Sequence, residues 1–380
     1  MNLDAFLIPP AETARRRGPH DRIVMSSRVR LARNIRKAAF PGWAKKAERL
    51  RVLELIQPAI AALPEMADAF FGTMDRLSAL DKQILVERHL ISREHAARNA
   101  GSGLVLNRPE TLSFMINEED HVRMQALSPG LQLHQAWAII NGADSALEKK
   151  LDYAFSPELG YLTACPTNLG TGIRVSAMLH LPGLVLAEQI NPIIQSVSKL
   201  GLTVRGLYGE GTEASGNIFQ VSNQMTLGES EAAIIQRLEK VLNQLIEHEE
   251  NARASLLERK PKLVYNHVGR AYGILANAHS ISSKETMNLL SLMRLGSDAG
   301  LFPELKTPEI YEGRDVRFEE LVAAALDKHG LRGGRADPRT PVILQTFGEA
   351  SARKLAQMRI GVPVVLLIGR PDGWDAARVK

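Results

Sequence analysis

The residues of this chain that could do chemistry lie in four short segments, and the first holds its only cysteine. Residues 165–174 form a polar loop of Pro, Asn, Thr and Gly, residue types that favour tight turns and expose backbone N–H groups. A thiol beside such donors and the Arg174 cation is placed where a thiolate would be stabilised. The loop alone leaves a second interpretation open, in which Cys165 is a small buried hydrophobe.

The second segment is a predicted strand at residues 23–33, whose period of two puts Arg28 and Arg30 on one face. Guanidinium groups present paired donors that match the oxygens of a phosphate, so two of them at this spacing indicate an anion clamp. The alternative is a solvated edge strand with no binding role.

The third segment, residues 117–123, follows an apolar strand predicted within 104–116. If that strand continues, Glu119, His121 and Arg123 line one face and offer an acid, an imidazole and a guanidinium together. The alternative is a charged turn that ends the strand, although carboxylates packed this closely repel one another unless a cation binds.

The fourth segment is a glycine-rich hairpin predicted at residues 202–221. It lacks the Lys-Ser/Thr ending of a P-loop and is not followed at once by a helix, so it is not the usual phosphate cradle. Its glycines alone indicate a turn. Glu210 and Glu213 within it could close over a bound cation.

The elements that must position these segments follow from hydrophobic periodicity. The pattern predicts helices at 44–63, 78–91 (less regular), 131–151, 192–200, 229–258, 282–295 and 318–329, and further strands at 159–164, 173–181, 218–221 and 362–368. A length of 380 residues suits two domains. We place the boundary at Lys260-Pro261, which ends the long helix.

Composition narrows the class of protein. A single cysteine excludes an internal disulfide framework, and Pro9, Pro10 and three arginines near the start replace the apolar core of a signal peptide, so we expect a cytoplasmic protein. No apolar run approaches the roughly 20 residues that span a bilayer. The net charge is +5, but basic residues are spread along the chain and aromatics make up 5%, so anionic small molecules fit better than nucleic acid.

The four segments together supply arginines, carboxylates and a thiol, which is the division of labour that phosphoryl transfer needs. Fixed cations and Mg²⁺ neutralise the charge on the moving phosphoryl group. If the nucleophile is itself a guanidinium, carboxylates must orient it and accept its proton. The residues therefore predict a kinase that acts on a guanidinium group.

In this order, residues 26–33, 117–123, 165–174 and 205–210 resemble the signature motifs of the phosphagen-kinase superfamily, the ATP:guanido phosphotransferases. Within it, the chain most resembles bacterial protein-arginine kinases of the McsB type, over about residues 20–255. The resemblance implies an α+β fold: a curved antiparallel sheet flanked by helices at residues 20–258, and a mainly helical domain at 262–380 that dimerises or regulates. It also implies transfer of the ATP γ-phosphate to arginine side chains of proteins, marking them for Clp-type degradation.

The resemblance also implies roles for single residues. Glu119 would be the catalytic base, Glu210 would hold the substrate guanidinium, and the Cys165 thiolate would stabilise its reactive form. Residues implied in binding ATP, with Mg²⁺, are Ser26, Ser27, Arg28, Val29, Arg30, His89, Arg123, Arg174, Val175, Ser176, Ala177, Met178, Arg205, Gly206, Leu207, Tyr208, Gly209 and Glu210. Arg335 and Arg339 keep the spacing of a phosphoarginine-sensing motif but lose the acid beside its first arginine.

Two features favour protein substrates with exposed arginines over free arginine or creatine. Small-molecule kinases place a helical domain of about 100 residues before their first arginine motif, and Arg28 comes too early for one. They also have an arginine where this sequence has Tyr208. A small-molecule guanidino kinase and a non-catalytic pseudokinase that binds partners remain alternatives. The implied partners are an activator protein, a Clp AAA+ protease in a stress response, and a second copy in a homodimer.

Overall fold

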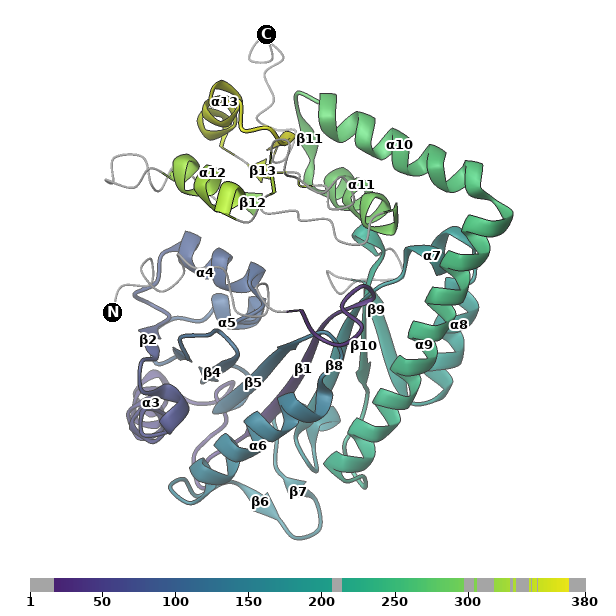
Figure 1. Ribbon diagram of the computed structural model, residues 1–380. Coiled ribbons are helices and arrows are strands. Elements are labelled where there is room, and N and C mark those ends of the chain that lie inside the picture. Colours follow the sequence, from purple (N-terminus) through teal and green to yellow (C-terminus); the bar gives the residue numbers. More distant parts are fainter. Residues whose placement is uncertain are drawn as a thin grey trace. The chain divides into compact units, whose positions relative to one another are not determined.

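The largest sheet of the computed structural model has eight strands (Figure 1). The structure describes residues 17–206, 214–296, 304–305, 318–328, 331–332, 342, 344–346 and 348–368. The strand order is β2-β3-β4-β5-β1-β8-β10-β9, and the pairs from β2 through β8 are antiparallel. The strands are β1 Val24–Arg33, β2 Phe70–Thr73, β3 Gly103–Leu106, β4 Leu112–Ile116, β5 Val122–Pro129, β8 Ile173–His180, β9 Leu202–Gly206 and β10 Ile218–Asn223. The antiparallel sheet and the α+β class are confirmed.

The two faces of this sheet differ in chemistry because side chains alternate along each strand. Figure 1 shows that α6 (Leu133–Glu148) covers one face of the sheet at β1 and β5. Val29 and Leu31 of β1 are fully buried on that face. Arg28 and Arg30 therefore project from the opposite face. The other helices described up to residue 259 are α3 Lys46–Ala61, η1 Pro64–Met66, α4 Ala79–Glu87, α5 Arg93–Ala96, η2 Pro166–Asn168, α7 Pro182–Leu186, α8 Ile190–Lys199, η3 Ser215–Asn217 and α9 Glu231–Arg259.

One predicted strand is wrong. Within residues 159–164 only Gly160–Tyr161 (β7) forms a strand, paired with Phe155–Ser156 (β6). Residues 162–164 do not continue the strand, because their backbone groups bond to side chains. The Leu162 carbonyl accepts a hydrogen bond from Asn34, and the Ala164 N–H donates one to Asp120.

The C-terminal part combines helices with a small sheet. α10 Pro261–Asn277 starts with a proline at its first position, where no N–H partner is needed, and is followed by α11 Ser283–Gly296, α12 Phe318–Lys328 and α13 Glu349–Gln357. Strands β11 Ile281–Ser282, β12 Glu304–Leu305, β13 Leu344–Thr346 and β14 Val364–Ile368 pair in parallel in the order β11-β14-β13-β12. The sequence predicted the β14 strand but not its short partners, because two- and three-residue strands carry no readable period.

Contacts divide the chain into two units. The first comprises the residues up to Leu179 with 192–204 and 220–246; the second comprises 180–191, 205–219 and the chain from Glu247 onward. The division thus runs through α9 and assigns residues 205–219 to the second unit.

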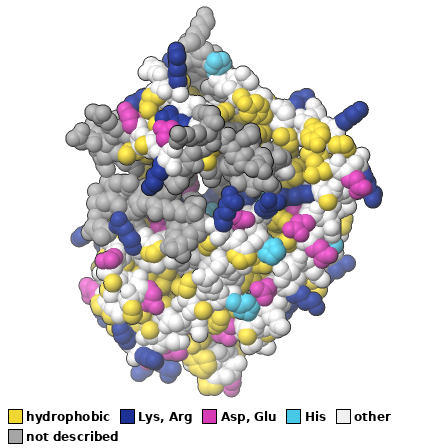
Figure 2. Space-filling view, viewed as in Figure 1, with side chains coloured by type: hydrophobic (Ala, Val, Ile, Leu, Met, Phe, Trp, Pro, Cys, Tyr) yellow, Lys and Arg dark blue, Asp and Glu magenta, His cyan; other side chains and the backbone are white. Residues whose placement is uncertain are grey.

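Figure 2 shows one face of the molecule, on which Lys and Arg side chains are spread among Asp and Glu. Among the described residues, no helix is both long and apolar enough to cross a bilayer.

Candidate active site

Four arginines project from one face of three neighbouring strands. In the register of β1 with β8, Arg30 lies opposite Arg174; in the register of β1 with β5, Ala32 lies opposite Arg123. Arg28 and Arg30 share their face with Ala32, so Arg123 and Arg174 belong to the same surface. We call these four residues the arginine cluster.

Neutral groups accept hydrogen bonds from two arginines of the cluster, Arg28 and Arg174. Arg28 donates from Nη2 to Gln220 Oε1 at 2.9 Å and from Nε to Ser176 Oγ at 3.4 Å. Arg174 donates to the carbonyl of Asn223 at 2.8 Å. Within the part of the chain that the structure describes, the buried Nε of Arg30 has no hydrogen-bond partner. An unpaired, desolvated donor of this kind is costly, and a bound anion would satisfy it.

Burial and the nearby positive charges lower the pKa values of two arginines of the cluster, Arg28 and Arg30. Burial, followed by the charges of Arg123 and Arg174, lowers the pKa of Arg28 to about 10. Burial and the neighbouring Arg28 likewise lower the pKa of Arg30 well below its usual value. With a pKa of about 10, Arg28 still carries its proton at neutral pH, so this face holds buried positive charge that favours the binding of an anion.

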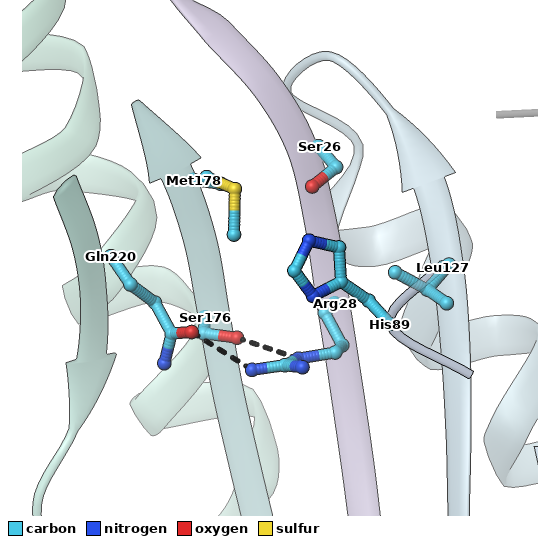
Figure 3. A pocket seen from close by; sticks show the side chains of 7 residues that line it. All are labelled: Ser26, Arg28, His89, Leu127, Ser176, Met178 and Gln220. Atoms are coloured by element: carbon cyan, nitrogen blue, oxygen red, sulfur yellow. Dashed lines mark hydrogen bonds between the residues drawn. The ribbon is translucent and has the colours of Figure 1, made fainter. Parts of the chain in front are cut away.

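A pocket next to the cluster adds apolar surface to this charge (Figure 3). Its lining comes from β1, β5, β8, β10 and the turn after α4, namely Ser26, Arg28, His89, Leu127, Ser176, Met178 and Gln220. The backbone of His89 has a φ of 59°, a left-handed conformation that turns the chain toward the pocket. Burial and the Arg28 charge lower the pKa of His89 to about 4, so its ring is neutral at pH 7 and can accept or donate one hydrogen bond.

Two carboxylates bind Arg123 from the turn between β4 and β5. Arg123 contacts Glu118 Oε2 and Glu119 Oε2, each at 2.6 Å. The side chain of Glu118 is 1% exposed, whereas that of Glu119 is 45% exposed. Burial alone would raise the pKa of Glu118, but Arg123 and the Ser92 hydroxyl lower it below its usual value. Glu118 therefore anchors Arg123, and Glu119 presents a carboxylate to solvent at the edge of the cluster.

The interpretation of residues 117–123 as a continuing strand is wrong, and the charged turn is correct. Asn117 ends β4 with a φ of 56° and donates to the carbonyls of Arg49 and Gly101. His121 does not join Glu119 and Arg123 as predicted: its Nδ1 accepts from the Ile35 N–H at 3.0 Å, and its Nε2 lies 3.0 Å from the Ala39 carbonyl.

Cys165 lies half-buried at the start of the one-turn helix Pro166–Asn168 (η2). Its Sγ is 3.0 Å from the hydroxyl of Thr167. The loop is fixed on both sides, because Ala164 N donates to Asp120 at 2.7 Å and Arg33 Nη1 donates to the Thr171 carbonyl at 2.9 Å. The thiol is thus held in a fixed loop and is not a core side chain.

Comparison with known proteins reveals the family. A sequence model of the ATP:guanido phosphotransferase C-terminal catalytic domain matches residues 51–252, and one of the protein-arginine kinase McsB C-terminal domain matches residues 261–312. A protein-arginine kinase of Moorella thermoacetica is 43% identical over 341 residues, 89% of this chain and 95% of that protein. The chain belongs to the protein-arginine kinase family.

Other relatives agree with this assignment. A protein-arginine kinase of Desulforamulus reducens is 50% identical over 287 residues, which cover 75% of this chain and 80% of that protein. Among solved structures, a lombricine kinase matches with a TM-score of 0.55 and 27% identity over 65% of this chain and 72% of its own. The duplicated taurocyamine kinase of Schistosoma mansoni matches with a TM-score of 0.57 and 26% identity over 64% of this chain and 36% of its own.

Several residues that were predicted to belong to the site do not face the arginine cluster or lie outside the described residues. The side chains of Ser27, Val29, Val175 and Ala177 are buried on the opposite face. Arg205 is exposed at the end of β9, next to the buried Gly206. Leu207, Tyr208, Gly209, Glu210, Glu213, Arg335 and Arg339 lie outside the described residues.

Several buried residues that support the site of this kinase-family chain were not predicted from the sequence. Arg33 is 1% exposed, pairs with Asp144 of α6 at 2.6 Å and lies 3.6 Å from the centroid of the Tyr161 ring. Its position in the strand did put it on the α6 face, but its partners are more than a hundred residues away in sequence. Asn34 and Asp120, which join the turn to the cysteine loop, were missed because they lie 86 residues apart in the sequence.

Proposed function

We propose that this protein transfers the γ-phosphoryl group of MgATP to arginine side chains of proteins, and that the arginine cluster with Glu119 and Cys165 is its active site. The observation that carries this proposal is the contact between Glu119 and Arg123, which puts an exposed carboxylate at the border of a desolvated anion site. A carboxylate there can hold a guanidinium substrate while the arginines hold the phosphates.

The arginine cluster would bind the polyphosphate, and the neighbouring pocket would receive the nucleoside against Leu127 and Met178. Phosphate oxygens would replace the neutral partners of Arg28 and satisfy the buried Nε of Arg30. Among the described residues, no three His, Cys, Asp or Glu side chains lie together as a metal site. Mg²⁺ carried by the nucleotide would neutralise phosphate charge.

Phosphoryl transfer requires that the substrate guanidinium lose a proton and that its nitrogen be aligned with the γ-phosphorus. The substrate guanidinium would lie against Glu119, which accepts its proton as one nitrogen bonds to the γ-phosphorus and the bond to the leaving ADP oxygen breaks. Arginines fixed before the reaction stabilise the charge on the moving group. Cys165 as a thiolate would add a second negative charge beside the guanidinium and favour the conformation that reacts.

Further parts of the proposal rest on the family rather than on geometry. We propose a cytoplasmic homodimer that works with an activator protein and delivers its products to a Clp AAA+ protease. Glu210 as a second holder of the guanidinium, and Arg335 with Arg339 as a phosphoarginine sensor, belong to this proposal as well.

The Glu119→Gln variant tests the proposed site. The amide keeps the size of the side chain and its contact with Arg123 but cannot accept a proton, so phosphoryl transfer should be lost while ATP still binds. The measurement is a single-turnover transfer assay alongside calorimetric titration with MgATP. Parallel loss of nucleotide affinity would contradict the role of Glu119 as base.

A further inference from the structure

Asp120 is a buried carboxylate directly after Glu119 and is 0% exposed. Its Oδ1 accepts two hydrogen bonds, from Asn34 Nδ2 at 2.7 Å and from the Ala164 N–H at 2.7 Å. Its Oδ2 is buried and has no partner among the residues that the structure describes. Burial raises the pKa of Asp120, although these two hydrogen bonds oppose the rise.

Asn34 extends this contact into a three-way junction. Its Nδ2 also donates to the Leu162 carbonyl at 2.9 Å, and its Oδ1 accepts from the His121 N–H at 2.9 Å. The side chains of Asn34 and Asp120 therefore join the end of β1, the turn that carries Glu119, and the segment that leads into Cys165. All three segments belong to the first unit.

The junction includes the sequence neighbours of both Glu119 and Cys165, the two groups proposed to contact the substrate guanidinium. Asp120 follows Glu119 in sequence, and Ala164 precedes Cys165. We propose that Asp120 is a positioning residue, which fixes the Glu119 carboxylate relative to the Cys165 thiol without touching the substrate. This inference rests on the proposed function, since it matters for catalysis only if both groups contact the guanidinium.

The hydrogen-bond pattern supplies a sharp test, because both bonds end on Oδ1. Asp120→Asn keeps an oxygen there and removes only the negative charge, so a positioning role predicts that it retains activity. Asp120→Ala removes both bonds and frees the cysteine loop. A misplacement of about 1 Å can reduce turnover about a hundredfold, which is the loss in kcat expected for Asp120→Ala.

Cys165 provides a readout that does not depend on catalysis. It is the only cysteine of the chain, so the rate of alkylation by iodoacetamide reports on this loop alone. We expect faster alkylation of Asp120→Ala and a wild-type rate for Asp120→Asn. ATP affinity should stay near the wild-type value in both variants, because all four residues of the arginine cluster are kept.

Glu249→Gln is the matched control for the loss of a buried carboxylate. Glu249 is 0% exposed, accepts from the N–H groups of Gly183 and Leu184, and belongs to the second unit. It should leave the Cys165 alkylation rate unchanged. If Asp120→Ala does not fold, Ala164→Pro removes the same loop N–H at an exposed position and should show the same faster alkylation and lower kcat.

Two results would overturn the inference. The first is a folded Asp120→Ala with wild-type kcat and wild-type alkylation of Cys165. The second is an Asp120→Asn variant as inactive as Asp120→Ala with unchanged alkylation, which would assign the residue an electrostatic role. If wild-type enzyme phosphorylates no arginine, the proposed function fails, whereas the alkylation rates still show whether Asp120 positions the loop.

Discussion

Replacing Arg28 with glutamine should stabilise the protein and abolish its binding of ATP. The arginine cluster holds its charge at a cost, since burial and the nearby Arg123 and Arg174 lower the pKa of Arg28 to about 10. A site built for an anion is destabilised while the anion is absent. Removing one charge should relieve that repulsion in the free protein and weaken the site in the complex.

The magnitude follows from the pKa. Lowering the pKa of Arg28 from its usual value to about 10 corresponds to roughly 3 kcal/mol of lost stability for the charged form at neutral pH. Against this, Arg28→Gln loses the hydrogen bond from the charged guanidinium to Gln220, worth about 2 kcal/mol, and a longer, weaker one to Ser176, and the new amide can remake one of the two at about 1 kcal/mol. We expect a net gain of about 1–2 kcal/mol, or a rise in Tm of about 2–8 °C.

The assay is thermal unfolding with and without MgATP. Wild-type protein should gain about 3 kcal/mol at nucleotide concentrations near 100 times Kd, and Arg28→Gln should gain almost nothing. Arg36→Gln is the matched control, because Arg36 is 52% exposed and pairs with Asp152 away from the cluster. It should change neither quantity. An Arg28→Gln variant that is less stable than wild type, or that keeps the full nucleotide shift, would refute the reasoning.

Three further predictions concern other parts of the chain. Cys165→Ala should slow turnover without abolishing it, measured as kcat at saturating MgATP; an unchanged rate would return the thiol to a packing role. Gly172→Ala should destabilise the chain by several kcal/mol in urea unfolding, because its φ is 69° and a Cβ would lie 2.7 Å from the Ala32 carbonyl oxygen; a wild-type midpoint would disprove this. Burial lowers the pKa of His95 to about 4, so the unfolded chain binds the extra proton and stability should fall by up to about 3 kcal/mol as pH drops from 6.5 to 4. His95→Gln should flatten that dependence in urea titrations, and an equally steep curve would exclude His95 as its source.

The arginine face could be predicted from the sequence because it depends on local period alone. Once residues 23–33 form a strand, Arg28 and Arg30 must share a face. The neighbouring strand brings in Arg174 by the same rule. What the sequence does not specify is the register, which places Arg174 opposite Arg30 and Arg123 opposite Ala32.

The turn at residues 117–121 was harder to predict because its cause is one backbone conformation. Asn117 adopts φ of 56° and donates to two carbonyls from distant segments, which ends the strand where the polar pattern alone would continue it. The buried junction of Asn34 with Asp120 is invisible for a related reason. Each residue is an ordinary polar loop residue by composition, and only the fold brings the two together.

The most direct test of the central claim is mass spectrometry of reaction mixtures that hold the purified protein, MgATP, an unrelated protein and free arginine, under conditions that preserve acid-labile N–P bonds. Wild-type protein should place phosphate on arginine side chains of the protein substrate and leave free arginine unmodified, and Glu119→Gln should place none. Phosphate on free arginine alone would contradict the account and assign the site to a small-molecule guanidino kinase.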